Sequence, residues 1–264
     1  HVSASMLKTL DESPFKVGEI LSGNHPEEKD CWRLGSATHC LTFEPDEFAK
    51  RYVRNKFDTK HRSKAFVAWE KEQLEAGRTI LTKNEHDTAT LCRDRLRSIP
   101  FIEALLESEG VCEESIRVSD PETGIPIRIR PDKLVFDVMG CNVIFDAKTI
   151  ASLTKQAIRK ALDHPSEWGR GYGIQSEHYQ TGARVEYGGK WRVIFGFVET
   201  NWPHRACAVE LDSRSRMDSQ EKRTELLRQF EDRRRSGDWS EWKDQISTLT
   251  LPSVAKTKRG WKPL

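Results

Sequence analysis

The chain has 264 residues, of which 36% are hydrophobic and 32% charged, and its formal net charge at pH 7 is +2. This length suits one large globular domain with a sizeable interior, and the hydrophobic content excludes an intrinsically disordered chain. A net charge this small does not by itself indicate a nucleic-acid partner.

The first predicted element is a helix near the N-terminus, where Ser3 and Ser5 precede Lys8. Backbone amides at a helix start, together with hydroxyl groups and a lysine, can hold a phosphate group, so these three residues are candidates for DNA binding. An ordinary capped helix uses the same residue types and is the alternative. A second helix is predicted to start at Ser13-Pro14, because proline suits the first helical position.

A helical stretch over residues 34–41 contains one histidine, His39, among small and apolar residues. Taken alone, this histidine fits either a hydrogen-bonded core residue or a metal ligand. Further helices are predicted after Glu44-Pro45, from the capping box Thr82–Glu85 to about Arg97, and from Pro100 to near Gly110.

Strands are predicted over residues 114–119 and 125–130, and a hairpin follows over residues 131–148. Side chains alternate along its second strand, so Asp146 and Lys148 share one face, whereas Val143, Phe145 and Ala147 share the other. A buried strand holds two charged side chains only at a cost, unless a metal, a partner or a substrate compensates them.

Asp132, at the start of the first hairpin strand, supplies a second carboxylate. Carboxylate ligands suit Mg²⁺ or Mn²⁺, which neutralises developing charge and activates water in phosphodiester hydrolysis. Lys148 can orient that water or stabilise the phosphate oxygens. The segment indicates a metal-dependent phosphodiesterase, and a structural ion pair at a strand end is the alternative.

A regular hairpin with its turn at residues 140–142 would not bring the two aspartates together. Asp132 would oppose Ile150, so its carboxylate would share a face with Asp146 but lie four residues out of step. That offset corresponds to roughly 13 Å at the rise of a strand. A bulge or a strong local twist is therefore expected in this hairpin.

Two helices and two strands are predicted after the hairpin, over residues 152–162, 172–185, 191–199 and 206–211. In the second helix, Gln175 and Tyr179 are i and i+4 neighbours and lie on one face. The strand over residues 191–199 is apolar on both faces after its first two residues, which is typical of a strand covered on both sides.

The C-terminal segment is basic, with thirteen Lys and Arg and eight Asp and Glu from Arg214 onwards. This surplus could contact phosphates or an acidic partner, but mixed charges at helical spacing favour a solvated helix face. The better candidates for a DNA track are the basic residues near the two aspartates, namely Arg128, Arg130, Lys133, Lys155, Arg159 and Lys160.

The six cysteines include no Cys-x-x-Cys pair, which excludes the usual disulfide and zinc patterns. The sequence has no signal segment and no apolar run near the ~18 residues of a membrane span. We therefore expect a cytoplasmic protein with free thiols and no membrane partner.

Four groups of residues, taken together, resemble a known family. They are His39 after Gly35-Ser36, Pro131-Asp132, Asp146-Ala147-Lys148, and Gln175 with Tyr179. In order and approximate spacing they are similar to the RecB-like branch of the PD-(D/E)xK nucleases. The chain most resembles the RecE-type exonucleases (exodeoxyribonuclease VIII) of phages and prophages, over roughly residues 2–212.

The resemblance implies a role for each matching residue. It identifies His39, Asp132 and Asp146 as metal ligands, with the backbone carbonyl of Ala147 as a further candidate. Lys148 is then the catalytic lysine. The motif has Asp at position 146 where many members have Glu, and either residue can ligate through oxygen.

Three further residues receive catalytic roles through the same resemblance. Gln175 and Tyr179 are expected to brace the lysine and the substrate strand. Glu114 resembles the acidic residue on the strand before Pro-Asp, although its neighbour Glu113 leaves this assignment ambiguous. An exposed structural glutamate fits position 114 equally well.

The implied fold class is α/β, a PD-(D/E)xK nuclease-like mixed central β-sheet flanked by α-helices, with an N-terminal helical region. The expected exonuclease domain covers residues 1–212, helical over 1–110 with the sheet core over 111–212, and a polar basic helix and tail covers residues 213–264.

The implied activity is Mg²⁺-dependent hydrolysis of double-stranded DNA from its ends, with Mn²⁺ as a substitute cation. The expected 5′ to 3′ direction would leave 3′ single-stranded tails for a RecT-type single-strand annealing protein in homologous recombination. A ring-shaped homo-oligomer is also implied, in a bacterial host whose phage or prophage encodes the chain. The alternatives are an endonuclease or nickase of the same superfamily, and a catalytically inactive DNA-binding recombination module.

Overall fold

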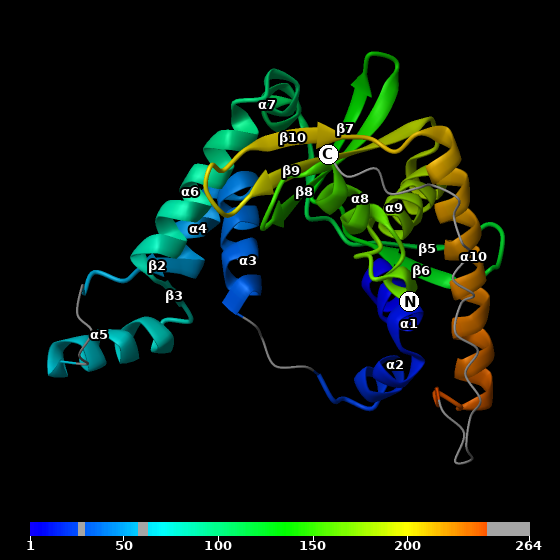
Figure 1. Cartoon of the computed structure of the whole chain (residues 1–264), viewed down its shortest axis with the longest axis horizontal. Coiled ribbons are helices and arrows are strands. Elements are labelled where there is room, and N and C mark those ends of the chain that lie inside the picture. The colour runs from blue at the N-terminus through cyan, green and yellow to red at the C-terminus, as the bar shows by residue number, and fades with distance from the viewer. Residues whose placement is uncertain (26–29, 58–62, 242–264) are drawn as a thin grey trace, which may run out of the picture.

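A five-stranded mixed sheet lies at the centre of the computed structural model, which describes residues 1–25, 30–57 and 63–241 (Figure 1). The strand order is β10-β9-β8-β7-β4, in which β8 and β9 are parallel and the other neighbours are antiparallel. Two small sheets, β1-β6-β5 and β2-β3, complete the strands of the described residues. This architecture confirms the expected mixed sheet flanked by helices.

The strands are β1 (Val2–Ser3), β2 (Tyr52–Arg54), β3 (Thr79–Leu81), β4 (Gly110–Cys112), β5 (Ile116–Ser119), β6 (Pro126–Ile129), β7 (Lys133–Val138), β8 (Cys141–Ile150), β9 (Trp191–Glu199) and β10 (Ala206–Val209). The helices are α1 (Ala4–Glu12), α2 (Pro14–Leu21), α3 (Asp30–Phe43), α4 (Pro45–Arg51), α5 (Lys64–Glu75), α6 (Lys83–Arg97), α7 (Pro100–Glu107), α8 (Lys155–Leu162), the 3₁₀ helix η1 (Pro165–Glu167), α9 (Tyr172–Tyr187) and α10 (Ser213–Ser236).

Local sequence signals fix where several helices begin. Ser13 accepts a hydrogen bond from the Lys16 amide at the start of α2, where Pro14 occupies the first turn. The predicted capping box is present at the start of α6, because Thr82 and Glu85 accept hydrogen bonds from each other's backbone amides. Helix α8 begins three residues later than predicted because Thr154 is its N-cap.

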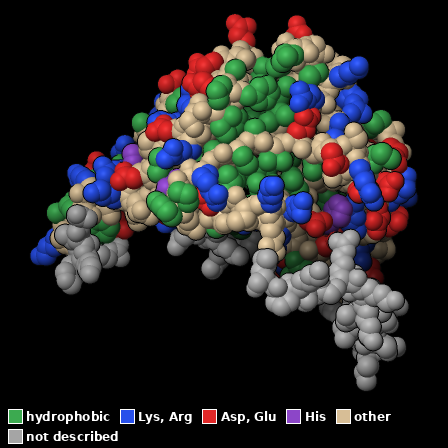
Figure 2. All heavy atoms as spheres, turned by 45° about the horizontal axis from the view of Figure 1, so that its top comes forward, with side chains coloured by type: hydrophobic (Ala, Val, Ile, Leu, Met, Phe, Trp, Pro, Cys, Tyr) green, Lys and Arg blue, Asp and Glu red, His purple; other side chains and the backbone are tan. Residues whose placement is uncertain are grey.

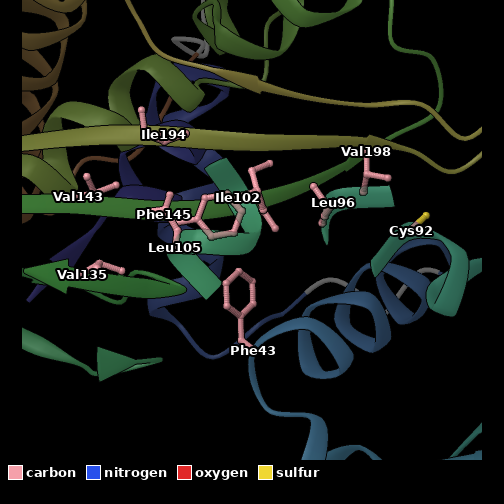
Figure 3. Packing of buried hydrophobic residues seen from close by; sticks show 11 residues of the cluster. Phe43, Cys92, Leu96, Ile102, Leu105, Val135, Val143, Phe145, Ile194 and Val198 are labelled. Atoms are coloured by element: carbon pink, nitrogen blue, oxygen red, sulfur yellow. The ribbon is translucent and has the colours of Figure 1, made fainter. Parts of the chain in front are cut away.

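One face of the central sheet packs against α3, α6 and α7 (Figure 3). On β8 this face presents Val143, Phe145 and Ala147, which are fully buried beside residues such as Leu96 and Ile102. The predicted alternation along this strand is therefore confirmed. Asp146 and Lys148 lie on the opposite face.

The opposite face of the sheet packs against α8 and α9 through a second apolar cluster that includes Ile144, Ile150 and Phe195. Helices α1 and α10 contact α9, so they form a further layer outside it (Figure 1). The two charged residues of β8 are therefore placed between the sheet and α9, and not towards solvent.

The hairpin of β7 and β8 has a tighter turn than predicted, and this corrects its expected register. Val138 pairs with Cys141, so Met139 and Gly140 alone form the turn, and both have positive φ. The ladder then shifts by one residue between Val138 and Val135, which is a β-bulge on β7. Because Lys133 pairs with Phe145, Asp132 faces Asp146 and not Ile150.

Helix α10 begins at Ser213, where the sequence analysis divided the chain, and it packs against α9 and α1. Its buried side chains include Arg223 and Phe230, so the described part of this segment is packed against the rest of the fold. The basic residues predicted for the tail beyond position 241 lie outside the described residues.

The surface of the molecule carries charges of both signs (Figure 2). Lysine and arginine side chains are interspersed with aspartate and glutamate on the face shown, in keeping with the formal net charge of +2. The five cysteines whose side chains are described are free, as expected. Among the described helices, none is both long and apolar enough for a membrane span.

Candidate active site

Two buried aspartates face each other across β7 and β8 and form the centre of the site. Asp132 is 6% exposed, and its Oδ2 accepts a hydrogen bond of 2.7 Å from the backbone amide of Ala147. His39, from α3, places its Nδ1 at 3.3 Å from the same oxygen. The histidine that was ambiguous in the sequence therefore lies beside the first aspartate.

Asp146 is fully buried and is held by two side chains from different elements. Its Oδ1 accepts a hydrogen bond of 3.1 Å from Gln175 Nε2 on α9, and its Oδ2 contacts the Lys148 ammonium. No donor within the described residues is aligned for a hydrogen bond with Oδ2. The Lys148 ammonium therefore compensates the charge of this buried carboxylate.

The charges of the site act strongly on one another because they are buried together. Burial favours the neutral form of Asp132, but His39, Lys148 and the Ala147 amide together lower the pKa of its carboxyl group. Burial and the neighbouring Asp132 raise the pKa of Asp146. Burial opposes the charge of Lys148, but both carboxylates raise its pKa, so its ammonium group stays protonated.

The acidic residue on the neighbouring segment is Glu113, which corrects the assignment of Glu114. Donor atoms of His39, Glu113 and Asp132 lie within 4.8 Å of one another. Glu114 instead points away, where its exposed carboxylate accepts a hydrogen bond of 2.7 Å from Tyr187. The reason is local, because Glu113 has φ of +55° and this left-handed residue interrupts the alternation expected of a strand.

Lys8 lies in the centre of the site and not on its outer surface. Its Nζ donates a hydrogen bond of 2.8 Å to Gln175 Oε1, so Gln175 links this lysine to Asp146. Lys8 and Lys148 both lie near the ring of Tyr172, with 5.0 and 5.1 Å between ammonium nitrogen and ring centroid. Burial and the neighbouring Lys148 lower the pKa of Lys8 to about 7.

Tyr172 was missed in the sequence analysis, although a helical signal could have found it. It precedes Gln175 by three residues and Tyr179 by seven, which places all three on one face of α9. Tyr179 is half-buried, and burial together with Asp146 raises the pKa of its hydroxyl group. This face of α9 therefore forms one wall of the site.

A large open cleft begins next to these residues. Its volume is about 1090 Å³, and it lies between α1, α3, the end of β8 and the segment that leads into α9. Lys8 and Tyr172 contribute to its wall, so the cleft is continuous with the group around Asp146. An extended substrate can therefore approach the buried charges from this side.

The remaining candidates for DNA binding are distributed around the site. Ser5 lines the cleft with Lys8, whereas the Ser3 hydroxyl accepts a hydrogen bond from the Met6 amide and caps α1. Arg128 and Arg130 are exposed near β6, and Arg130 Nε lies 2.9 Å from the Glu113 carboxylate. Lys155 and Arg159 are exposed on α8. These four residues and Lys160, which is also exposed on α8, remain predictions for DNA binding. Lys133 does not fit a DNA track, because it is buried and its Nζ donates to the carbonyl oxygens of Leu106 and Ser108.

The donor set fits a hard divalent cation. Carboxylate oxygens from Asp132 and Glu113 and one imidazole nitrogen from His39 converge. Oxygen donors with a single nitrogen suit Mg²⁺ or Mn²⁺. Asp146 is not part of the converging group of three, because its carboxylate contacts Lys148 and Gln175.

Comparisons with known proteins agree with this geometry. The sequence matches the family described as “PDDEXK-like domain of unknown function (DUF3799)” over residues 3–243. A search of the curated proteins finds no match to the chain.

Two solved structures have been compared with the fold. A protein from Eubacterium rectale, described as a “Putative exonuclease”, has a TM-score of 0.62 and 17% sequence identity, with 98% of this chain and 93% of that chain covered. The structure of SSO0001 has a TM-score of 0.30 and 14% identity, with 84% of each chain covered. At such identities the first likeness concerns the fold alone.

Proposed function

Because this chain belongs to the family of PDDEXK-like domains, we propose that it is a metal-dependent nuclease that hydrolyses phosphodiester bonds in DNA. One observation carries the proposal: Asp132, Asp146 and Lys148 lie together on one buried face of the sheet, beside an open cleft. These residues stand in the Pro-Asp and Asp-x-Lys motifs that match the letters of the family name.

The residues divide the work of the reaction between them. Asp132, Glu113 and His39 would hold Mg²⁺ or Mn²⁺, with Asp146 and the Ala147 carbonyl as further ligand candidates. When bound, the cation would supply positive charge for the phosphate oxygens and make water a stronger acid.

Lys148 serves the reaction through its permanent charge. Its ammonium group is held against Asp146, where it can orient the attacking water or stabilise charge on the phosphate. Gln175 fixes the Asp146 carboxylate from the α9 side and is itself fixed by Lys8. Tyr172 and Tyr179 shield these groups from solvent.

The substrate we propose is double-stranded DNA with free ends, digested in the 5′ to 3′ direction. The resemblance to RecE-type exonucleases supports this polarity, and the solved structure with the similar fold is described as a “Putative exonuclease”. The products would be 3′ single-stranded tails for a RecT-type annealing protein. The same resemblance is the ground for a ring-shaped homo-oligomer and for a role in recombination.

Endonuclease or nickase activity is the alternative among enzymes, and the fate of circular DNA separates the two. An exonuclease leaves covalently closed circles intact, whereas an endonuclease or nickase opens them. A catalytically inactive DNA-binding module is the alternative outside enzymes. Calorimetry separates it, because such a module would bind neither Mg²⁺ nor Mn²⁺.

The proposal is tested with linear duplex DNA labelled separately at each end, in Mg²⁺ or in EDTA. We expect metal-dependent release of label from the 5′ end, and a loss of about a hundredfold or more in Asp146→Asn. Asp137→Asn is the matched control, because Asp137 is an exposed aspartate in the same hairpin. Full activity of Asp146→Asn, or hydrolysis in EDTA, would contradict the proposed site.

A further inference from the structure

The cleft beside the site carries two tryptophans that the catalytic roles do not explain. Trp168, between η1 and α9, is 86% exposed, and Trp32, on α3, is 44% exposed. Both belong to the lining of the cleft, together with Tyr172. Exposure of large apolar rings to water is unfavourable, so their presence in an open cleft indicates a ligand that covers them.

Trp168 is presented by a rigid segment. Its backbone amide donates a hydrogen bond to Pro165 O at 3.0 Å, and the Gly169 amide donates one to His164 O at 2.8 Å. The segment is also fixed to α1, because the Ser166 amide and hydroxyl both donate to Asp11 Oδ2 at 3.0 Å. The backbone that carries the ring is therefore fixed beside the cleft.

The backbone of Trp168 adopts a conformation that bulky residues rarely accept. Its φ is +65°, in the left-handed region, which costs free energy for any residue other than glycine. The next residue must be glycine, because a Cβ on Gly169 would lie 2.1 Å from Asp163 O. A strained backbone that projects an exposed aromatic ring is typical of a binding site.

The polar residues of the cleft suit an anionic chain. Arg170 contributes a positive charge, Lys8 contributes an amino group that can donate hydrogen bonds, and Ser5 and Thr9 contribute hydroxyl groups. Glu12 is the one acidic residue that the described part of the chain adds to the lining, and Lys16 pairs with it at 2.5 Å. The volume of about 1090 Å³ exceeds that of a typical small-ligand pocket, so an extended ligand fits.

We propose that this cleft binds an unpaired strand of DNA and stacks its bases on Trp168 and Trp32. An anionic backbone matches the lysine and arginine, and exposed base faces match the rings. A base inside a duplex is stacked and paired, so only an unpaired base can offer its face to a tryptophan. The inference rests on the proposed function and makes it more specific, because it states that the DNA strand that reaches Asp146 is unpaired.

Binding in EDTA tests the inference without any hydrolysis. The affinity for a fluorescein-labelled single-stranded oligonucleotide is measured by anisotropy for the wild type, Trp168→Asn and Trp168→Phe. Asn removes the ring and tolerates positive φ, whereas Phe keeps an aromatic face. We expect Trp168→Asn to weaken binding about tenfold or more and Trp168→Phe to weaken it by about threefold or less.

Trp202→Ala is the matched control for an exposed tryptophan outside the cleft, because Trp202 is also 86% exposed. It should bind the oligonucleotide as the wild type does. Equal affinities of the wild type and Trp168→Asn would overturn the inference, and so would equal losses in Trp168→Asn and Trp202→Ala.

An oligonucleotide of abasic residues separates stacking from phosphate contacts. The wild type should bind it about tenfold more weakly than the normal oligonucleotide, and Trp168→Asn should cause no further loss. A further loss on the abasic strand would overturn base stacking. Failure of the proposed function is a different result, which the hydrolysis assay would show. In that case the wild type would bind the strand through Trp168 but would not hydrolyse DNA in the presence of Mg²⁺ or Mn²⁺.

Discussion

Two groups of buried charged residues lie in the described part of this molecule, and they differ in whether a cleft gives access to them. The first is the group of Asp132, Asp146 and Lys148 beside the cleft. The second joins Asp120, before β6, to Arg223 on α10, and both residues are at most 1% exposed. Both groups are costly to bury, so their burial alone does not distinguish them.

The second group is held by several hydrogen bonds, although Arg223 Nη1 has no hydrogen-bond partner among the described residues. Asp120 accepts hydrogen bonds from the amide and hydroxyl of Thr123 at 2.9 and 2.8 Å, and it pairs with Arg223. Arg223 Nε donates to His178 Nδ1 at 3.3 Å, and His178 Nε2 lies 3.3 Å from the Arg128 carbonyl oxygen.

In the first group, Asp146 Oδ2 contacts the Lys148 ammonium, and the cleft lined by Lys8 and Tyr172 gives access to the group. Each group contains one buried polar atom without a hydrogen-bond partner, so access from a cleft, rather than buried charge or incomplete pairing, marks the reactive site.

The largest expected effect on stability comes from breaking the pair of Asp120 and Arg223. Arg223→Leu should lower the free energy of unfolding by about 3–5 kcal/mol, because it leaves the Asp120 carboxylate buried without its partner. Urea denaturation measures this loss, and the folded variant should keep its hydrolytic activity. Arg234→Leu, at an exposed position of the same helix, is the matched control and should have a far smaller effect.

A double variant checks the cause of that loss. Asp120→Asn combined with Arg223→Leu removes both charges, so it should recover part of the stability lost in Arg223→Leu alone. If the double variant is as unstable as the sum of the two single variants, the two residues do not act as a pair.

An intermediate effect is expected for pH, through His178. Burial and Arg223 lower the pKa of this histidine to about 3, whereas an unfolded histidine titrates near 6.5. Between these values the unfolded chain binds a proton that the folded chain does not, so stability falls as pH falls, by about 1.4 kcal/mol per pH unit. The stability gap between wild type and His178→Gln should therefore shift by about 2 kcal/mol from pH 6.5 to pH 5.

Denaturation series at several pH values measure this gap. Other titrating groups are shared by the two proteins and largely cancel in the difference. Parallel stability curves for the two proteins would show that His178 takes up no proton on unfolding in this range.

The smallest expected effect concerns metal binding beside Asp132, where the neighbouring residues Glu113 and Glu114 are compared. Glu113→Gln should weaken Mn²⁺ binding by about tenfold, because it removes one of the converging donors. Glu114→Gln should leave the affinity unchanged, since its carboxylate contacts Tyr187. Calorimetric titration with Mn²⁺ measures both, and the reverse order of effects would return the role to Glu114.

Local patterns in the sequence were sufficient to predict much of the fold. The capping box at Thr82, the proline at the start of α2 and the residues of β9 match the structure, because each depends on neighbours in the chain. The shared face of Asp146 and Lys148 was also predictable, because strand alternation needs no distant partner.

Features that depend on distant partners or on unusual backbone angles were not predictable in the same way. The pair of Asp120 and Arg223 joins positions 103 residues apart, and Asp120 alone is typical of a turn. The role of Glu113 depends on a positive φ that no nearby glycine signals. The place of Lys8 beside Gln175 depends on how α1 packs against α9.

The bulge on β7 has a consequence for how this hairpin can change in length. A deletion of one residue at the bulge would leave a regular ladder in which Asp132 still faces Asp146. A deletion of one residue on β8 between Cys141 and Asp146 would instead have one of two results. Either β7 would have two residues more than β8 in the bulge, or the register would shift so that Asp146 no longer pairs opposite Asp132. Among related sequences, one-residue deletions should therefore be found at the bulge on β7 and should be absent from β8 between Cys141 and Asp146.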